Sequence, residues 1–403
     1  MKNAVPICLC CLALLFSCSR NDTGQDADGG VSVLEETSKN HFYTFTYPSV
    51  DSEGKPVELS AALMAWNRGK ARNECIETVL VGCHVTIDSN DRCPTMYPVS
   101  LITEDTWAMY VLAVSSELEA LGHCIVIMPD YEGFGVSQDH THPYLARELT
   151  GRQVSDALRY GLGYYNATEG TIPLSENWKT ICTGYSQGGS VALATQRYME
   201  ENGLAEQFHL AGSLCGDGPY DIIATLRYYL EDDGGSYGVS TSHRKNRTSM
   251  PEVLPMIING MLSSHPAMRG HKASDYLTGY AASGDLSRIF TPECYAWMTD
   301  KSRLGTDPLP DGSPMGDLHY ALWDNSLCHG WEPAHRIVFA HSKYDTIVPF
   351  GNYESFVAEH PSAPVRLNVF CESDNHIAAG TFYKDLIIGQ FDQDLEWLLE
   401  GGE

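Results

Sequence analysis

Positive charge is scarce in this sequence. Its 403 residues include 26 Lys and Arg against 52 Asp and Glu, which gives a formal net charge of -26. A chain with this charge repels polyanions at long range and gains nothing from the counterion release that drives nucleic-acid binding. We therefore expect a solvated acidic surface and no nucleic-acid partner.

Repeats and metal-binding cysteine patterns are also missing. Heptads and repeats with a period of about 20 to 50 residues are absent, which argues against coiled coils and solenoids. No Cys-x-x-Cys pair accompanies a histidine cluster, so a zinc site has little support. The chain is 43% hydrophobic, which suits one large α/β domain with an insertion, or two domains.

The N-terminus carries an apolar run from Ala4 to Phe16. The run is too short to span a bilayer comfortably and is typical of an export signal. The stretch "LLFSC" resembles a bacterial lipobox, which implies cleavage before Cys18 and acylation of its thiol. We expect a signal peptide over 1–17, a polar tether over 18–40, and a lipid-anchored protein of the bacterial cell envelope, on its periplasmic face or at the cell surface. An ordinary cleaved signal with an incidental cysteine is the alternative.

Nine of the 13 cysteines remain beyond Cys18. An odd number leaves at least one thiol free unless it pairs between chains. Export permits disulfides, and Cys83 with Cys93 could close a short loop, but the connectivity cannot be read from the sequence.

Strand and helix patterns alternate from about residue 42, which predicts an α/β fold with a mostly parallel sheet and helices on both faces. Continuous or alternating apolar runs predict strands at 41–50, 57–66, 77–85, 123–131, 178–186 and from 208, 335 and 364 onward. Amphipathic patterns predict helices at 103–121, 152–165, 187–201 and 382–400. The alternation fails between 222 and 334, where we expect an inserted helical cap. The core is then formed by 41–221 and 335–403.

A Gly-x-Ser-x-Gly pentapeptide, "GYSQG", lies between a predicted strand and a predicted helix. This strand-to-helix turn is the context in which such a serine acts as a nucleophile. The turn is tight, so side chains at Gly184 and Gly188 would clash with neighbouring backbone. The first turn of the helix also directs free N–H groups toward the place where negative charge would form. Ser186 is therefore the predicted nucleophile.

A serine nucleophile needs a base to take its proton and an acid to orient that base. Asp345 and His376 follow the last two predicted strands, and the carboxyl ends of parallel strands meet at one sheet edge. Asp217, after the strand that follows the pentapeptide, is a rival acid. His341 precedes Asp345 in the chain and is the weaker candidate for the base, and Asp374 is expected to cap a turn.

These motifs resemble the α/β-hydrolase superfamily and, within it, the secretory lipase and esterase group. The words that carry the resemblance are "CHVTIDSNDRCPT", "PDYEGFGVSQDHTHPYL", "GYSQGG", "YDTIVP" and "DNH". The resemblance implies an α/β-hydrolase fold with an eight-stranded sheet and a helical cap inserted before the acid strand.

The resemblance also implies an oxyanion hole made by the N–H of Gln187 and by an N–H of the loop after the third strand. Group members usually have His-Gly-Thr where this chain has His84-Val85-Thr86, so either Val85 or Thr86 could donate. His84 and Tyr131 are candidates for lining the pocket, although two glycines beside Tyr131 favour a structural role for that loop.

The predicted function is that of a serine hydrolase that cleaves carboxylic esters through an acyl-enzyme intermediate. Its substrate would be a small-molecule, lipid or glycan ester, and the predicted chemistry needs neither a cofactor nor a metal. Two alternatives stay open. The same three residues could cleave peptides, or the fold could serve a non-catalytic surface protein that binds glycans or lipids.

Overall fold

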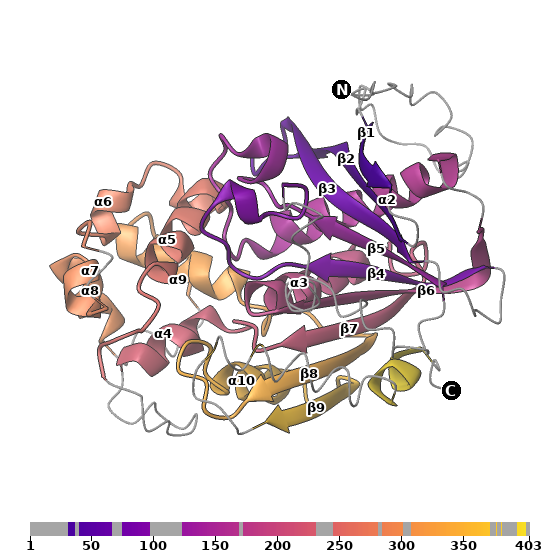
Figure 1. The fold of residues 1–403 in the computed structure, drawn as a ribbon. Helices are drawn as coiled ribbons and strands as arrows, with labels where there is room; N and C mark the ends of the chain where they lie inside the picture. The colour runs from indigo at the N-terminus through magenta and orange to yellow at the C-terminus, as the bar shows by residue number, and fades with distance from the viewer. Residues whose placement is uncertain are drawn as a thin grey trace.

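The computed structural model describes residues 31–36, 40–66, 75–96, 123–168, 172–230, 245–280, 284–300, 308–370, 376, 380 and 393–399. These residues form one sheet with the strand order β1-β2-β3-β5-β4-β6-β7-β8-β9, flanked by helices (Figure 1). The strands are β1 Val31–Glu36, β2 Asn40–Val50, β3 Pro56–Trp66, β4 Ile76–Cys83, β5 His123–Pro129, β6 Leu174–Tyr185, β7 Leu210–Gly216, β8 Arg336–Ser342 and β9 Val365–Phe370.

Strands β5, β4, β6, β7, β8 and β9 pair in parallel, whereas β1, β2 and β3 form an antiparallel edge that joins β5. The mostly parallel sheet is confirmed, and the eight expected strands are β2 to β9. A ninth, β1, was not expected, because 31–36 was assigned to the polar tether. That boundary is wrong: "VSVLEE" pairs with β2 as an edge strand.

Helices cover both faces of the sheet. On one face α2 Arg147–Thr168, α3 Gln187–Glu201 and α10 Gly351–Glu359 bury side chains such as Val154, Val191 and Phe356 against the strands. On the other face Leu395 and Leu398, from the helical residues 393–399, pack on a second cluster. Strands buried on both faces explain the continuous apolar runs of β4 and β5. The helix predicted over 103–121 lies outside the described residues.

In the described residues between β7 and β8, six α-helices gather beyond the carboxyl ends of the parallel strands (Figure 1). They are α4 Ile222–Leu230, α5 Val253–Ser264, α6 Ala273–Tyr276, α7 Leu286–Ile289, α8 Pro292–Met298 and α9 Pro314–Asn325. We call this group the cap. It has its own apolar core, to which Leu254, Phe290 and Leu322 belong. The starts of α8 and α9 follow ordinary capping rules, with Thr or Ser before a Pro.

The end of the cap is attached to the last turn of α3. The Glu200 carboxylate accepts hydrogen bonds from the indole of Trp331 (2.9 Å), the N–H of Ala334 (3.1 Å) and both the N–H (3.0 Å) and the ring Nδ1 (2.9 Å) of His335. One turn earlier the Arg197 guanidinium donates to the carbonyl of His329 (2.7 Å). The segment that returns from the cap to β8 is therefore fixed to the core.

All eight cysteines in the described residues are free thiols. The Cys83–Cys93 bridge that the sequence allowed is not formed. The Cys93 thiol instead lies within hydrogen-bonding distance of Asn90 and Thr95 (3.8 Å each).

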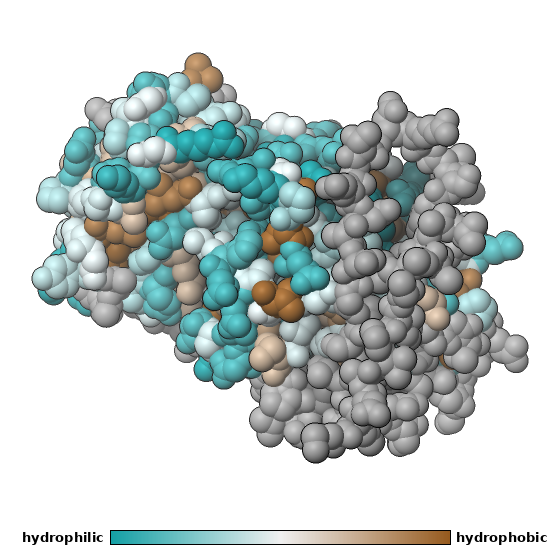
Figure 2. Space-filling model, turned by 90° about the horizontal axis from the view of Figure 1, so that it is seen from above, coloured by the Kyte–Doolittle hydropathy of each residue, from teal (hydrophilic) through white to brown (hydrophobic). Residues whose placement is uncertain are grey.

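The described surface is largely polar. Figure 2 shows hydrophilic residues over most of the coloured part of the visible face, with small separate hydrophobic patches. None of the helices in the described part of the chain combines the length and the apolar content of a bilayer-crossing segment.

Candidate active site

Strand β6 ends at Tyr185, and α3 begins at Gln187, so Ser186 alone makes the turn between them. Its backbone has φ 57° and ψ -125°, an unfavourable region for a residue with a side chain. The Ser186 N–H donates to the carbonyl of Gly216 at the end of β7 (2.8 Å), which fixes this conformation. The turn raises the serine side chain at the carboxyl edge of the sheet.

Two glycines make room for this turn, as the sequence predicted. A Cβ atom at Gly184 would lie 2.5 Å from the backbone oxygen of Cys83, and one at Gly188 would lie 2.0 Å from the same oxygen. Both distances are far below van der Waals contact. Since the obstacle is backbone of β4, it cannot rotate away as a side chain could.

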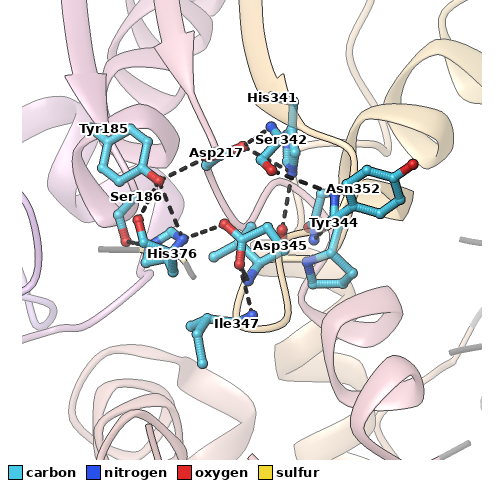
Figure 3. A network of polar contacts seen from close by, with 12 residues as sticks. Tyr185, Ser186, Asp217, His341, Ser342, Tyr344, Asp345, Ile347, Asn352 and His376 are labelled. Atoms are coloured by element: carbon cyan, nitrogen blue, oxygen red, sulfur yellow. Dashed lines mark hydrogen bonds and ion pairs between the residues drawn. The ribbon is translucent and has the colours of Figure 1, made fainter. Parts of the chain in front are cut away.

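The structure brings Ser186, His376 and Asp345 into one chain of hydrogen bonds (Figure 3). The ring Nε2 of His376 lies 2.7 Å from Ser186 Oγ, and its Nδ1 is hydrogen-bonded to Asp345 Oδ2. The other oxygen of Asp345 accepts the N–H groups of Ile347 (2.7 Å) and Val348 (3.0 Å). The loop after β8 thus orients the carboxylate through its own backbone.

This arrangement fixes the protonation of the histidine. Because Asp345 only accepts, His376 carries a proton on Nδ1, and its Nε2 is left to accept the Ser186 hydroxyl proton. Burial alone would lower the pKa of His376. The Asp345 carboxylate, its hydrogen bond and the nearby Asp217 carboxylate raise that pKa above its ordinary value of 6.5. The group is thus built to hold a positive charge on the imidazole.

The rival acid Asp217 and the rival base His341 lie next to the hydrogen-bonded set of Ser186, His376 and Asp345 (Figure 3). Asp217 is fully buried and accepts the N–H of Ser342 (2.6 Å) and the hydroxyl of Tyr185 (2.8 Å), while Asp345 holds the histidine ring. The ring of His341 hydrogen-bonds to the carbonyl of Val348 (3.0 Å). Asp374 lies outside the described residues.

Asp217, Asp345 and His376 form the one group of three potential metal ligands found among the described residues, with ligand atoms within 4.8 Å of one another. Those atoms already bind each other and backbone N–H groups. The donor set therefore fits a hydrogen-bonded network within the protein.

The predicted oxyanion residues face the same edge from two elements. Gln187 opens α3, where first-turn N–H groups have no acceptor inside the helix and the helix dipole favours negative charge. Its side chain lies 2.7 Å from the Nε2 of His142. Thr86 is held by the hydroxyl of Tyr144 (2.9 Å), and Val85 packs on the apolar cluster of the sheet. Which N–H, that of Val85 or of Thr86, would complete the hole stays a prediction.

His84 and Tyr131 are buried and stacked, with ring centroids 4.0 Å apart. The ring nitrogens of His84 lie 3.0 Å from the Asp130 carbonyl and 2.6 Å from the Val85 carbonyl. Burial lowers the pKa of His84 to about 4, so the ring is neutral and donates to one carbonyl at a time. These contacts join the loop after β4 to the residue that follows β5. The pocket role expected for the two residues stays a prediction.

Tyr185 is the site residue that sequence reasoning missed. It stands directly before the nucleophile, and its hydroxyl donates to the Asp217 carboxylate or to the His376 carbonyl, each 2.8 Å away. The only signal in the sequence was that Tyr185 occupies the first variable position of the Gly-x-Ser-x-Gly motif.

Comparison with known structures identifies the fold of this chain. No protein-family model matches the sequence, and no curated protein matches it. The structure is similar to the rice cell wall degrading esterase LipA from Xanthomonas oryzae, with a TM-score of 0.66, 22% identity, and coverage of 88% of this chain and 90% of that one. The chain has the α/β-hydrolase fold.

Two further α/β-hydrolase structures agree. A Legionella pneumophila protein described as a putative hydrolase gives a TM-score of 0.63 at 14% identity, over 89% of each chain. Candida antarctica lipase A in its closed state gives 0.59 at 14% identity, over 88% of this chain and 78% of that one. In the α/β-hydrolase order the nucleophile comes first, then the acid, then the histidine. Ser186, Asp345 and His376 occur in that order.

Proposed function

We propose that this protein is a serine hydrolase that cleaves carboxylic esters through an acyl-enzyme intermediate. The observation that carries the proposal is the continuous chain from Ser186 Oγ through the His376 ring to Asp345, set at the turn between β6 and α3. Because the fold already holds these groups next to one another, the reaction avoids the entropy cost of bringing them together.

In the first half of the reaction, Ser186 Oγ attacks the ester carbonyl carbon while His376 Nε2 takes the hydroxyl proton. Asp345 stabilises the imidazolium through Nδ1. The carbonyl oxygen becomes negative and accepts the N–H of Gln187, together with an N–H of Val85 or Thr86. The imidazolium then gives its proton to the departing alkoxide, which leaves as the alcohol.

In the second half, His376 takes a proton from water, and the hydroxide attacks the acyl carbon on Ser186. The same donors hold the second oxyanion. Collapse releases the carboxylic acid and returns the proton to Ser186 Oγ. The residues of this chain supply every proton transfer, so the proposed mechanism requires no cofactor.

Labelling with a fluorophosphonate probe tests the proposal. Wild-type protein should be labelled at Ser186, and Ser186→Ala should lose labelling and about 10,000-fold or more of its ester turnover. Ser155→Ala, which removes another buried serine hydroxyl from α2, should behave like the wild type. Unchanged turnover in Ser186→Ala would reject the proposal.

A series of esters from acetyl to palmitoyl defines the substrate class. A sharp preference for acetyl would indicate deacetylation of a glycan or a small molecule, whereas activity that rises with chain length would indicate a lipase. A matched peptide amide tests the peptidase alternative. Faster cleavage of the amide than of the ester would support it.

We also propose that the protein is exported and lipid-anchored through Cys18, on the evidence of the "LLFSC" stretch. When it is expressed in a bacterium, wild-type protein should partition into detergent, because acyl chains contribute about 0.8 kcal/mol per buried methylene. Cys18→Ser should remain in the aqueous phase. Cys11→Ser, within the predicted signal, is the control and should keep the anchor. Aqueous partitioning of the wild type would contradict the proposal.

A further inference from the structure

Three neighbouring strands end at one point behind His376. Tyr185 closes β6 and pairs in register with Gly216 of β7, and Gly216 pairs with Ala340 of β8. Asp217 directly follows Gly216, and His341 directly follows Ala340, so parallel pairing brings the ends of the three strands side by side. Figure 3 shows Tyr185 and Asp217 beside the ring of His376, with His341 next to Asp217.

Asp217 is a buried carboxylate held by directed donors. Its exposed fraction is 0%, and it accepts the N–H of Ser342 (2.6 Å) and the Tyr185 hydroxyl (2.8 Å), with His341 Nε2 at 3.4 Å. Its φ is 36°, although it is not a glycine. A strained residue that presents a buried charge is typical of a functional position.

Tyr185 connects this carboxylate to the histidine. The two rings are stacked with centroids 5.1 Å apart, and the hydroxyl oxygen lies 2.8 Å from the His376 carbonyl and 3.5 Å from His376 Nδ1. The same oxygen is 2.8 Å from Asp217 Oδ2. A small rotation of the imidazole away from Asp345 would bring Nδ1 within hydrogen-bonding distance of this hydroxyl.

We propose that Tyr185 and Asp217 form a second acid unit for His376, in which the tyrosine hydroxyl bridges the imidazole and the carboxylate. This inference rests on the proposed function. In the bridged state His376 Nδ1–H donates to the Tyr185 oxygen, and the Tyr185 hydroxyl donates to Asp217 Oδ2. No proton is gained or lost, and Nε2 stays free to accept from Ser186. Both residues are positioning residues, since neither touches the ester.

While Asp345 is in place, the second unit acts through its charge. The groups that face the His376 ring are Asp345 from the loop after β8, Asp217 from the end of β7, and Tyr185 and Ser186 from the turn after β6. His341 of β8 faces Asp217 from the other side. Asp217 therefore adds a second negative charge beside the imidazolium and raises the pKa of His376.

Removal of Asp345 provides the first test. Asp345→Ala is preferred to the asparagine variant, because an amide could donate to Nδ1 and impose the wrong tautomer. Where a triad has only one acid, its loss lowers kcat by about 10,000-fold. Because Tyr185 and Asp217 would partly replace Asp345, we expect kcat of Asp345→Ala to fall by only about 100-fold to 1,000-fold. Adding Asp217→Asn or Tyr185→Phe to Asp345→Ala should each cost about a further tenfold or more. Equal activity of the single and double variants would overturn the inference.

The pH profile of kcat/KM provides the second test. Asp217→Asn in the intact chain should move the acidic limb to lower pH by about half a unit or more, because the imidazolium loses a stabilising charge. Asp156→Asn is the matched control. Asp156 is a partly buried carboxylate of α2 that contacts Ser49, and its removal should leave the limb in place. An unmoved limb in Asp217→Asn, with Tyr185→Phe also unmoved, would overturn the inference.

The two proposals fail differently. If the wild type neither labels nor turns over esters, the serine-hydrolase proposal fails and this inference fails with it. If the wild type is active but the Asp345→Ala series and the acidic limb do not respond to Asp217 or Tyr185, only the inference fails. Far-ultraviolet circular dichroism and thermal unfolding of each variant identify any that do not fold, and Tyr185→Phe then decides in place of Asp217→Asn.

Discussion

Ser186 and Asp217 both have positive φ angles, 57° and 36°, although neither is a glycine. Such conformations cost about 1 to 3 kcal/mol each, and they persist only where the surroundings fix them. Here hydrogen bonds between strand ends do so: Ser186 N–H donates to the Gly216 carbonyl and Asp217 N–H to the Ala340 carbonyl. Two strained backbone positions of this edge thus lie beside His376.

The titration of His376 gives a prediction at the residue scale. Its pKa lies above 6.5 in the folded protein, because the two carboxylates outweigh the effect of burial. The ring must be neutral to act as a base, so kcat/KM should fall about tenfold per pH unit below that pKa. A pH series with a short-chain ester measures this. A midpoint of the acidic limb below 6.5 would contradict the prediction.

Much of the site was predictable residue by residue, because each signal is local. Ser186 was marked by its glycines, and Asp345 and His376 by their places after strands in a sheet whose carboxyl ends meet. Tyr185 was not predictable, because its role depends on the register that sets β6 beside β7. Sequence shows the end of each strand but not which residue of the neighbouring strand lies opposite.

At the scale of elements, the turn from β6 into α3 determines the most about the site. It places the serine, directs the first N–H groups of α3 toward the same point, and brings the helix against the backbone of β4. The close approach at Gly188, 2.0 Å for an added Cβ, measures how little space separates α3 from β4.

Gly188→Ala should therefore be strongly destabilising. The free energy of unfolding, measured with denaturant, should fall by about 3 kcal/mol or more, because the obstructing Cys83 carbonyl is held in the sheet. Gly203→Ala is the control. Gly203 has φ 67° and open space around its Cα, so it should lose only about 1 kcal/mol through backbone strain. Equal losses in the two variants would show that crowding at the turn is not the cause.

Among the elements, the eight strands β2 to β9 were predictable from their continuous or alternating apolar runs, and the runs are continuous where a strand is buried on both faces, as in β5. Strand β1 was not, since six residues with two adjacent glutamates resemble a linker as much as an edge strand. The bounds of the short cap helices were not predicted, since only a helical cap between 222 and 334 was expected. Helices of four to twelve residues owe their stability to packing in the cap core, and isolated periodicity is weak at that length.

At the scale of the whole molecule, the cap touches the site on two sides. The hydroxyl of Tyr229 in α4 donates to the carbonyl of Ile347, in the loop that orients Asp345. The hydroxyl of Tyr144, which belongs to the cap core, meets Thr86 of the predicted oxyanion loop. Displacement of the cap would therefore disturb both the loop that carries Asp345 and the predicted oxyanion loop at Thr86.

The attachment at Glu200 makes a prediction about stability. Glu200→Gln replaces a carboxylate that accepts four hydrogen bonds, so the free energy of unfolding at about pH 7 should fall by about 2 to 3 kcal/mol. Although burial opposes ionisation, the donors lower the pKa of Glu200 below its ordinary 4.5. Its contribution is therefore present above that value and is lost as the pH falls through the lower folded value.

The difference between wild type and Glu200→Gln should accordingly shrink below pH 4.5. Glu201→Gln is the matched control. Glu201 pairs with Arg197 and its side chain is 36% exposed, so its loss should cost less than about 1 kcal/mol. A constant difference between pH 7 and acid would show that the charge of Glu200 is not what stabilises the attachment.

Helix α3 begins directly after Ser186, and its last turn holds the cap's return segment. Chimeras in which the cap is exchanged for that of another protein with this fold depend on both ends of the helix. A junction placed at the end of α9 would leave Glu200 and Arg197 facing an unmatched segment. A junction placed after His335 would transfer Trp331, Ala334 and His335 together, so the donor must also provide the last turn of α3. Cap and α3 form one transferable module.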